Sequence, residues 1–141
     1  MVSSFGRIIN FYSISILGLD ISCGGYMTED FLEFPSGTRY YPTNIICTWI
    51  IRRDHAYRIF FERFSIERHA ECLDDYLQIN GGEKICGRVS LKDIYMNGST
   101  ETNITFRSDG FGSSTGFRIG VFRVRNGMIQ LNYMKCLHLP S

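Results

Sequence analysis

Apolar and polar side chains alternate along several short segments of this 141-residue chain. The alternation is clearest in residues 45–51, 57–62, 102–108 and 117–121, and residues 76–79 add one more short apolar segment. A period of two residues is typical of β-strands that bury one face, whereas no segment sustains the 3.6-residue period of a helix. Short strands with turn residues between them predict an all-β fold, an antiparallel sandwich of two sheets.

The same alternation predicts which side chains form the core. Those expected to point inward include Ile45, Cys47, Trp49, Ile51, Tyr57, Ile59, Phe61, Ile104 and Phe106. Phe64 and Ile66 continue the apolar set after Phe61, but the phase changes by one residue. Such a change of phase within one strand predicts a β-bulge.

Turn residues separate the alternating segments. Asn80-Gly81-Gly82 and Asn97-Gly98 are strong turn signals, and residues 110–116 form a loop of mainly Gly and Ser. Two further turns are expected nearer the N-terminus, at 33–37 and 41–44.

Length and charge narrow the class of protein. A chain of this length is one domain that buries a core without help. Its net charge of +1 gives no reason to expect a nucleic-acid partner. No segment is both long and apolar enough to span a membrane.

Five cysteines are more than a cytosolic chain of this size usually carries. No CxxC pair is present and the three histidines are far from the cysteines, so a zinc site is not expected. Disulfides formed in an oxidising compartment are the better interpretation. Cys23, Cys47, Cys72 and Cys86 allow three pairings that spacing alone does not decide, and Cys136 is left over.

Residues 1–22 have two interpretations. Arg7 precedes an apolar run of about twelve residues, which is typical of a secretory signal peptide. Asn10, Tyr12 and several serines dilute the run and no A-x-A site precedes Cys23, so a strand or a piece of an upstream segment is the other interpretation. Residues 125–141 show no clear pattern and form an unassigned tail.

Eight short motifs occur in an order, and with gaps, that resemble the CUB domain family. They are C-G-G at 23–25, Y-P-T-N at 41–44, C-T-W-I-I at 47–51, R-I-F-F-E-R-F-S-I-E at 58–67, C-L-D-D-Y-L-Q-I at 72–79, C-G at 86–87, I-T-F-R-S-D at 104–109 and G-F-R-I at 116–119. The resemblance covers about residues 23–124 and leaves the tail with Cys136 outside. It implies a jelly-roll-like sandwich with disulfides Cys23–Cys47 and Cys72–Cys86.

Three carboxylates are the candidate metal ligands. Glu67, Asp75 and Asp109 carry a formal charge of −3, and they would repel each other at one end of a sandwich unless a cation lay between them. Ca²⁺ prefers such oxygen ligands. In the calcium-binding branch of the family the acids at these motif positions ligate Ca²⁺. The resemblance also implies a main-chain carbonyl ligand just after Asp109, at Gly110 or Phe111, and a supporting hydroxyl from Tyr41.

The resemblance further implies a secreted, non-catalytic module that binds a Lys or Arg of a protein partner through the calcium-ligating acids. Two alternatives stay open. The chain is a non-catalytic piece, or a truncated isoform, of a multidomain secreted protease of the astacin (tolloid-like) or trypsin-like type. Otherwise it is a spermadhesin-like carbohydrate-binding protein, although such proteins usually lack the full set of acids.

Other motifs add modification sites but no catalytic ones. Asn97 and Asn103 begin N-glycosylation sequons and fit exposed positions, a turn and an outward strand face. No G-x-S-x-G motif is present and no Ser, His and Asp set is discernible, so we expect no catalytic residue. Cys136 is expected to form an intermolecular or interdomain disulfide, or to remain a free thiol.

Overall fold

The computed structural model describes residues 12–16 and 19–125. Its strands are β1 (Tyr12–Ile16), β2 (Leu19–Cys23), β3 (Gly25–Tyr26), β4 (Phe31–Phe34), β5 (Ile46–Ile51), β6 (Tyr57–Ile66), β7 (Tyr76–Ile79), β8 (Gly87–Arg88), β9 (Ile94–Met96), β10 (Thr102–Arg107) and β11 (Gly116–Arg123). These residues form no helix, and therefore none that could cross a membrane. The predicted all-β class is confirmed.

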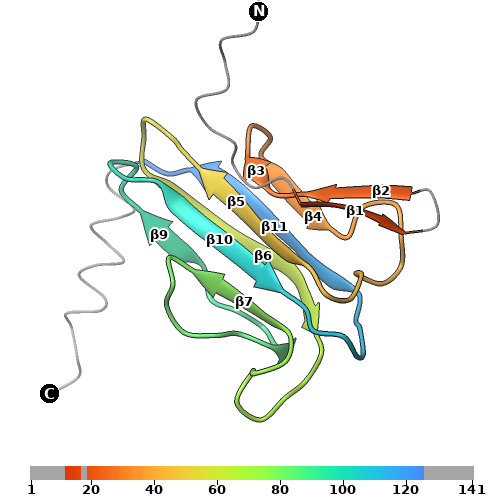
Figure 1. Ribbon diagram of the computed structural model, residues 1–141. Coiled ribbons are helices and arrows are strands. Elements are labelled where there is room, and N and C mark those ends of the chain that lie inside the picture. The colour runs from red at the N-terminus through yellow and green to blue at the C-terminus, as the bar shows by residue number, and fades with distance from the viewer. Residues whose placement is uncertain (1–11, 17–18, 126–141) are drawn as a thin grey trace, which may run out of the picture.

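Two sheets stack to form the sandwich (Figure 1). One has the strand order β3-β5-β10-β7, and the other has the order β4-β11-β6-β8 with β9 also paired to β6. Neighbouring strands are antiparallel except for β3, which pairs with β5 in parallel. β1 and β2 form a separate antiparallel pair.

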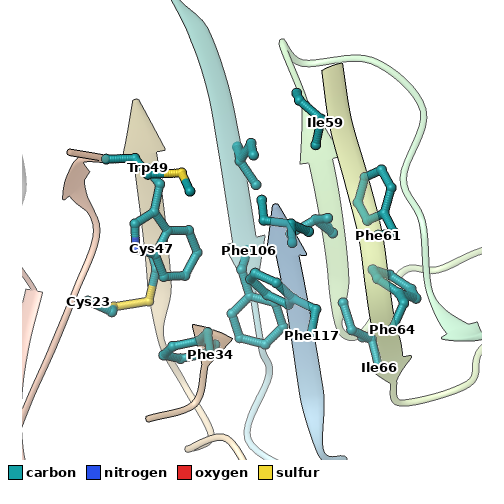
Figure 2. Packing of buried hydrophobic residues seen from close by; sticks show 14 of the residues in the cluster. Cys23, Phe34, Cys47, Trp49, Ile59, Phe61, Phe64, Ile66, Phe106 and Phe117 are labelled. Atoms are coloured by element: carbon teal, nitrogen blue, oxygen red, sulfur yellow. A yellow bond between two sulfur atoms is a disulfide. The ribbon is translucent and has the colours of Figure 1, made fainter. Parts of the chain in front are cut away.

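The core lies between the two sheets (Figure 2). Trp49 and Phe106 come from the first sheet and Phe117 from the second, and the Phe34 ring packs against all three with centroid distances of 5.2–5.9 Å. Every side chain that the alternation placed inward is buried. Trp49 is thus a core residue, because one face of a half-buried strand supplies the apolar surface of the domain.

The predicted bulge is confirmed in β6. Phe61 pairs with Ile119 and Arg63 pairs with Arg118, so Glu62 is the extra residue. This extra residue restores Phe64 and Ile66 to the buried face. Glu67 follows directly after Ile66, the last residue of β6.

Both disulfides that the family resemblance implied are present. Cys23–Cys47 links the end of β2 to β5, and Cys72–Cys86 joins the loop after β6 to the residue before β8, with Cα–Cα distances of 5.4 and 5.5 Å. Each contributes about 3 kcal/mol by restricting the unfolded chain. The second disulfide holds the loop that carries Glu67 and Asp75.

The expected turn at 33–37 is wrong at its start, because Glu33 and Phe34 belong to β4 and the bend begins at Pro35. Phe34 is buried against aromatic rings of distant segments, and this burial holds the segment as a strand.

The expected signal peptide at 1–22 lies largely outside the described residues, and the β1–β2 pairing does not test it. Residues 126–141, with Cys136, lie outside the described residues as well.

Candidate metal centre

β6 and β10 end, and β7 begins, at the same end of the sandwich (Figure 1), and the three predicted acids lie next to these strand ends. β10 runs antiparallel to both β5 and β7, and its last residue, Arg107, pairs with the first residue of each, Ile46 and Tyr76. Asp75 immediately precedes β7 and Asp109 follows β10, so register alone places them side by side. Glu67 reaches the same end because it follows the last residue of β6.

The three carboxylates form a tight cluster. One carboxylate oxygen from each of Glu67, Asp75 and Asp109 lies within 4.8 Å of the others. Two oxygens that ligate one Ca²⁺ at about 2.3–2.6 Å are at most about 5 Å apart, so this spacing fits a shared calcium ion. None of the three forms an ion pair with a basic side chain of the described residues.

Asp75 is the buried centre of the cluster, with no exposed side-chain surface. Its Oδ2 accepts a hydrogen bond of 2.7 Å from the Tyr41 hydroxyl, and its Oδ1 accepts one of 2.8 Å from the Asp109 backbone N–H. Burial raises the pKa of Asp75, while these two hydrogen bonds act in the opposite direction. The carboxylate is therefore held in place by donors that do not neutralise it.

Tyr41 connects two of the acids through hydrogen bonds. Its hydroxyl donates to Asp75 and accepts a hydrogen bond of 2.9 Å from the Glu67 backbone N–H. Burial and the bond to Asp75 raise the pKa of the Tyr41 phenol far above its ordinary value, so the hydroxyl remains a donor. The residue is 2% exposed and packs edge-on against Phe106.

Glu67 is half-buried and lies next to the other two acids and to Gly112. Burial comes first among the causes that raise the pKa of its carboxyl, followed by the charges of Asp75 and Asp109. The carboxylate lies against Gly112, where a Cβ atom would overlap it and where φ is +75°. Gly112 therefore suits both the positive φ of this position and the place that the Glu67 carboxylate occupies.

The loop after β10 is fixed by contacts that the sequence did not single out. Ser108 is 4% exposed, and its hydroxyl donates to the Pro42 carbonyl at 2.7 Å. The Asp109 carbonyl accepts from the Asn44 N–H at 2.8 Å, and the Ser113 hydroxyl donates to the Tyr41 carbonyl at 2.6 Å. Ser108 lies two residues after Phe106 and continues the buried alternation of Ile104 and Phe106. A polar residue at such a core-facing position could have indicated this contact from the sequence.

The remaining predicted residues lie in the loop after β10 and on the exposed surface. Gly110 and Phe111 follow Asp109, and the Phe111 N–H donates to Asp109 Oδ1 at 3.0 Å; their role as carbonyl ligands stays a prediction. Asp74, left out of the predicted site, has its carboxylate 3.9 Å from His69 Nε2. Asn97 and Asn103 are exposed, and their glycosylation also stays a prediction.

A sequence model of the CUB domain family matches residues 23–120. Among curated proteins, the chain is 32% identical over 113 residues to the zinc metalloproteinase nas-39 of Caenorhabditis elegans, which covers 75% of this chain and 12% of that protein. It is 28% identical over 127 residues to a bone morphogenetic protein 1 homolog of Strongylocentrotus purpuratus, covering 82% and 20%. The chain thus spans at most a fifth of the length of these two relatives.

Solved structures give the same assignment. The MASP-1 CUB2 domain bound to Ca²⁺ superimposes with a TM-score of 0.59 at 29% identity, covering 72% of this chain and 99% of that one. The CUB1-EGF-CUB2 region of human MASP-1/3 reaches a TM-score of 0.64 at 25% identity, covering 82% and 49%. With its motifs, its disulfides and its sandwich in agreement, this chain belongs to the CUB domain family, whose members are interaction modules of extracellular proteins.

Proposed function

We propose that this chain is an extracellular module that binds Ca²⁺ through Glu67, Asp75 and Asp109. Through this site it would bind a Lys or Arg side chain of a protein partner. The observation that carries the proposal is the cluster itself: three carboxylate oxygens within 4.8 Å, one of them on a fully buried side chain. A buried carboxylate without a cation is unfavourable, so the cluster favours binding of a cation.

The donor set favours calcium over other metals. All three side chains offer hard oxygen ligands, and the described residues around them offer no cysteine or histidine within the cluster. The Gly110–Gly112 loop is exposed and next to Asp109, so it can supply a carbonyl oxygen and leave room for water. A neighbour in fold, the MASP-1 CUB2 domain, is described as bound to Ca²⁺.

The protein's own residues orient the ligands. Tyr41 and the Asp109 N–H hold the two oxygens of Asp75, and the Asn44 N–H and the Phe111 N–H hold the Asp109 segment. A bound calcium ion supplies two positive charges and removes most of the repulsion among the acids. The three carboxylates and one ion sum to about −1, which leaves the site attractive to one basic side chain.

The setting of this function is outside the cell. Two disulfides form in an oxidising compartment, and residues 1–22 would direct secretion as a signal peptide. Asn97 and Asn103 would carry N-linked glycans, since both side chains are exposed. The contact itself is ionic and would weaken as salt is added.

A second candidate keeps the same binding role but assigns it to a longer protein. Relatives such as nas-39 are named as zinc metalloproteinases, and the match covers only 12% of that protein. The chain would then be a non-catalytic CUB module, or a truncated isoform, of a secreted protease. The longer transcript distinguishes the two candidates.

Thermal unfolding with and without calcium tests the proposed site. Saturating calcium, at about a hundredfold excess over Kd, would stabilise the wild type by about 2.7 kcal/mol, or raise Tm by about 10 °C. Asp109→Ala would lose this shift. Asp30→Ala, an exposed acid away from the cluster, is the matched control and would keep it. A wild-type Tm that does not respond to calcium would refute the site.

A further inference from the structure

A groove opens beside the acidic cluster. It has a volume of about 740 Å³ and is lined by residues 65–70 at the end of β6, by the Cys72–Cys86 disulfide, by residues 87–89 around β8 and by Ser113 and Ser114. Glu67 belongs to both the groove and the cluster. A partner that reaches the acids therefore has this groove directly in its path.

Two arginines give one side of the groove a positive charge. Arg68 and Arg88 are both exposed, and neither forms an ion pair or a side-chain hydrogen bond within the described part of the chain. Both arginines line the groove, and the Arg68 Cγ atom lies 3.9 Å from where a Cβ of Gly87, the residue before Arg88, would be. Arg52 and Arg118, by contrast, are paired with glutamates.

The rest of the groove suits a polypeptide. Val89 is 42% exposed and the disulfide contributes apolar surface, while Ser113 and Ser114 contribute polar groups. Negative charge at Glu67 and positive charge at Arg68 are adjacent in the sequence, so the surface changes sign across one residue. A uniformly anionic chain, such as a sulfated glycan, would be repelled at Glu67.

We propose that the groove binds the part of the partner next to its Lys or Arg, and that this part carries an acidic side chain for Arg68 and Arg88. This inference rests on the calcium-dependent function proposed above and specifies its partner. The partner segment is extended, so that its basic and acidic residues reach the cluster and the arginines at the same time. Charge-assisted contacts to arginine give such a segment both affinity and orientation.

Peptide selection tests the inference without a known ligand. The full chain is immobilised in saturating calcium and a phage library of random linear peptides is selected on it, with elution by chelator. We expect enriched sequences that contain a Lys or Arg and, at a fixed short spacing, an Asp or Glu. Synthetic peptides made from these sequences then serve as the probes for binding measurements.

Charge reversal supplies the matched pair of variants. Arg68→Glu with Arg88→Glu is expected to weaken the selected peptide about tenfold or more, because two charge-assisted contacts become repulsive. Changing the acidic residue of the peptide to Lys should restore binding to that variant. Arg123→Glu with Arg125→Glu changes the net charge equally at the far end of the sandwich and should leave Kd unchanged. Both double variants should keep the calcium-dependent rise in Tm.

The outcomes separate this inference from the function on which it rests. Calcium-dependent peptides that carry a basic residue but no acidic one, with Kd unaffected at Arg68 and Arg88, would overturn the groove assignment and leave the calcium site standing. No calcium-dependent enrichment at all would overturn the proposed function. Calcium-independent binding of heparin fragments, lost on charge reversal, would assign the arginines to a glycan instead.

Discussion

Each end of the sandwich buries one tyrosine, and the two tyrosines have different partners. At one end the Tyr57 hydroxyl lies 2.6 Å from the Thr102 hydroxyl, and both side chains are fully buried. At the other end the Tyr41 hydroxyl lies 2.7 Å from a carboxylate oxygen of Asp75. The first pair is neutral, whereas the second leaves a negative charge in the interior of the protein.

This difference separates a structural polar contact from a functional one. A neutral buried pair is satisfied by its own hydrogen bond and requires nothing further. A buried carboxylate with two donors is oriented but still charged, and Glu67 and Asp109 add charge of the same sign. The Tyr41 end therefore requires a ligand that the Tyr57 end does not, and that ligand is a cation.

The largest effect is expected from removing one charge of the cluster. In chelator, Glu67→Gln should stabilise the protein. The fold raises the pKa of the Glu67 carboxyl, so at any pH above the pKa of the unfolded chain the ionised carboxylate opposes folding. In saturating calcium the same variant should lose most of the stabilisation of about 2.7 kcal/mol that the ion gives. Chemical denaturation with and without calcium measures both signs.

Glu62→Gln is the control, since Glu62 is an exposed bulge residue paired with Arg118. It should leave the response to calcium unchanged. If Glu67→Gln destabilised the protein equally in chelator and in calcium, repulsion within the cluster would not be the relevant force.

A smaller effect should come from the two tyrosines themselves. Tyr57→Phe and Tyr41→Phe each leave a buried hydrogen-bonding partner unpaired, so each should lower the free energy of unfolding by about 1–2 kcal/mol in chelator. Only Tyr41→Phe should also weaken calcium binding, because it releases Asp75 and the Glu67 backbone. Calcium titrations followed by calorimetry make the comparison. An equal loss of calcium affinity in both variants would mean that general destabilisation, and not ligand orientation, is responsible.

The sequence predicted the sandwich well because the relevant signal is local. Alternation along each strand assigns a face to each residue, and it placed Cys47, Ile59 and Phe106 correctly in the core. The bulge at Glu62 was visible for the same reason, as a break in that alternation. The disulfide pairings and the acid set came from the family resemblance, since spacing by itself left the pairings open.

Features that depend on distant contacts could not be predicted. The last two residues of β4, Glu33 and Phe34, were expected to belong to a turn because the turn residues 35–37 follow them. Pairing with β11 and burial of Phe34 make them part of a strand. β8 and β9 have two and three residues, too few for a periodic pattern. The contacts of Ser113 and Gly112 with Tyr41 and Glu67 depend on loop conformation, which has no period to detect.

The smallest effect is expected at Phe111, and it tests whether this position acts through its backbone. The side chain is 84% exposed, while its N–H holds Asp109. Phe111→Ala keeps that N–H and the adjacent carbonyl, so the free energy of unfolding should change by less than about 0.5 kcal/mol, and the calcium Kd should not change. Gly112→Ala is the contrasting variant, because its Cβ would overlap the Glu67 carboxylate at a strained φ, and it should weaken calcium binding. A calcium Kd altered by Phe111→Ala would mean that the exposed ring, rather than the backbone of the loop, supports the site.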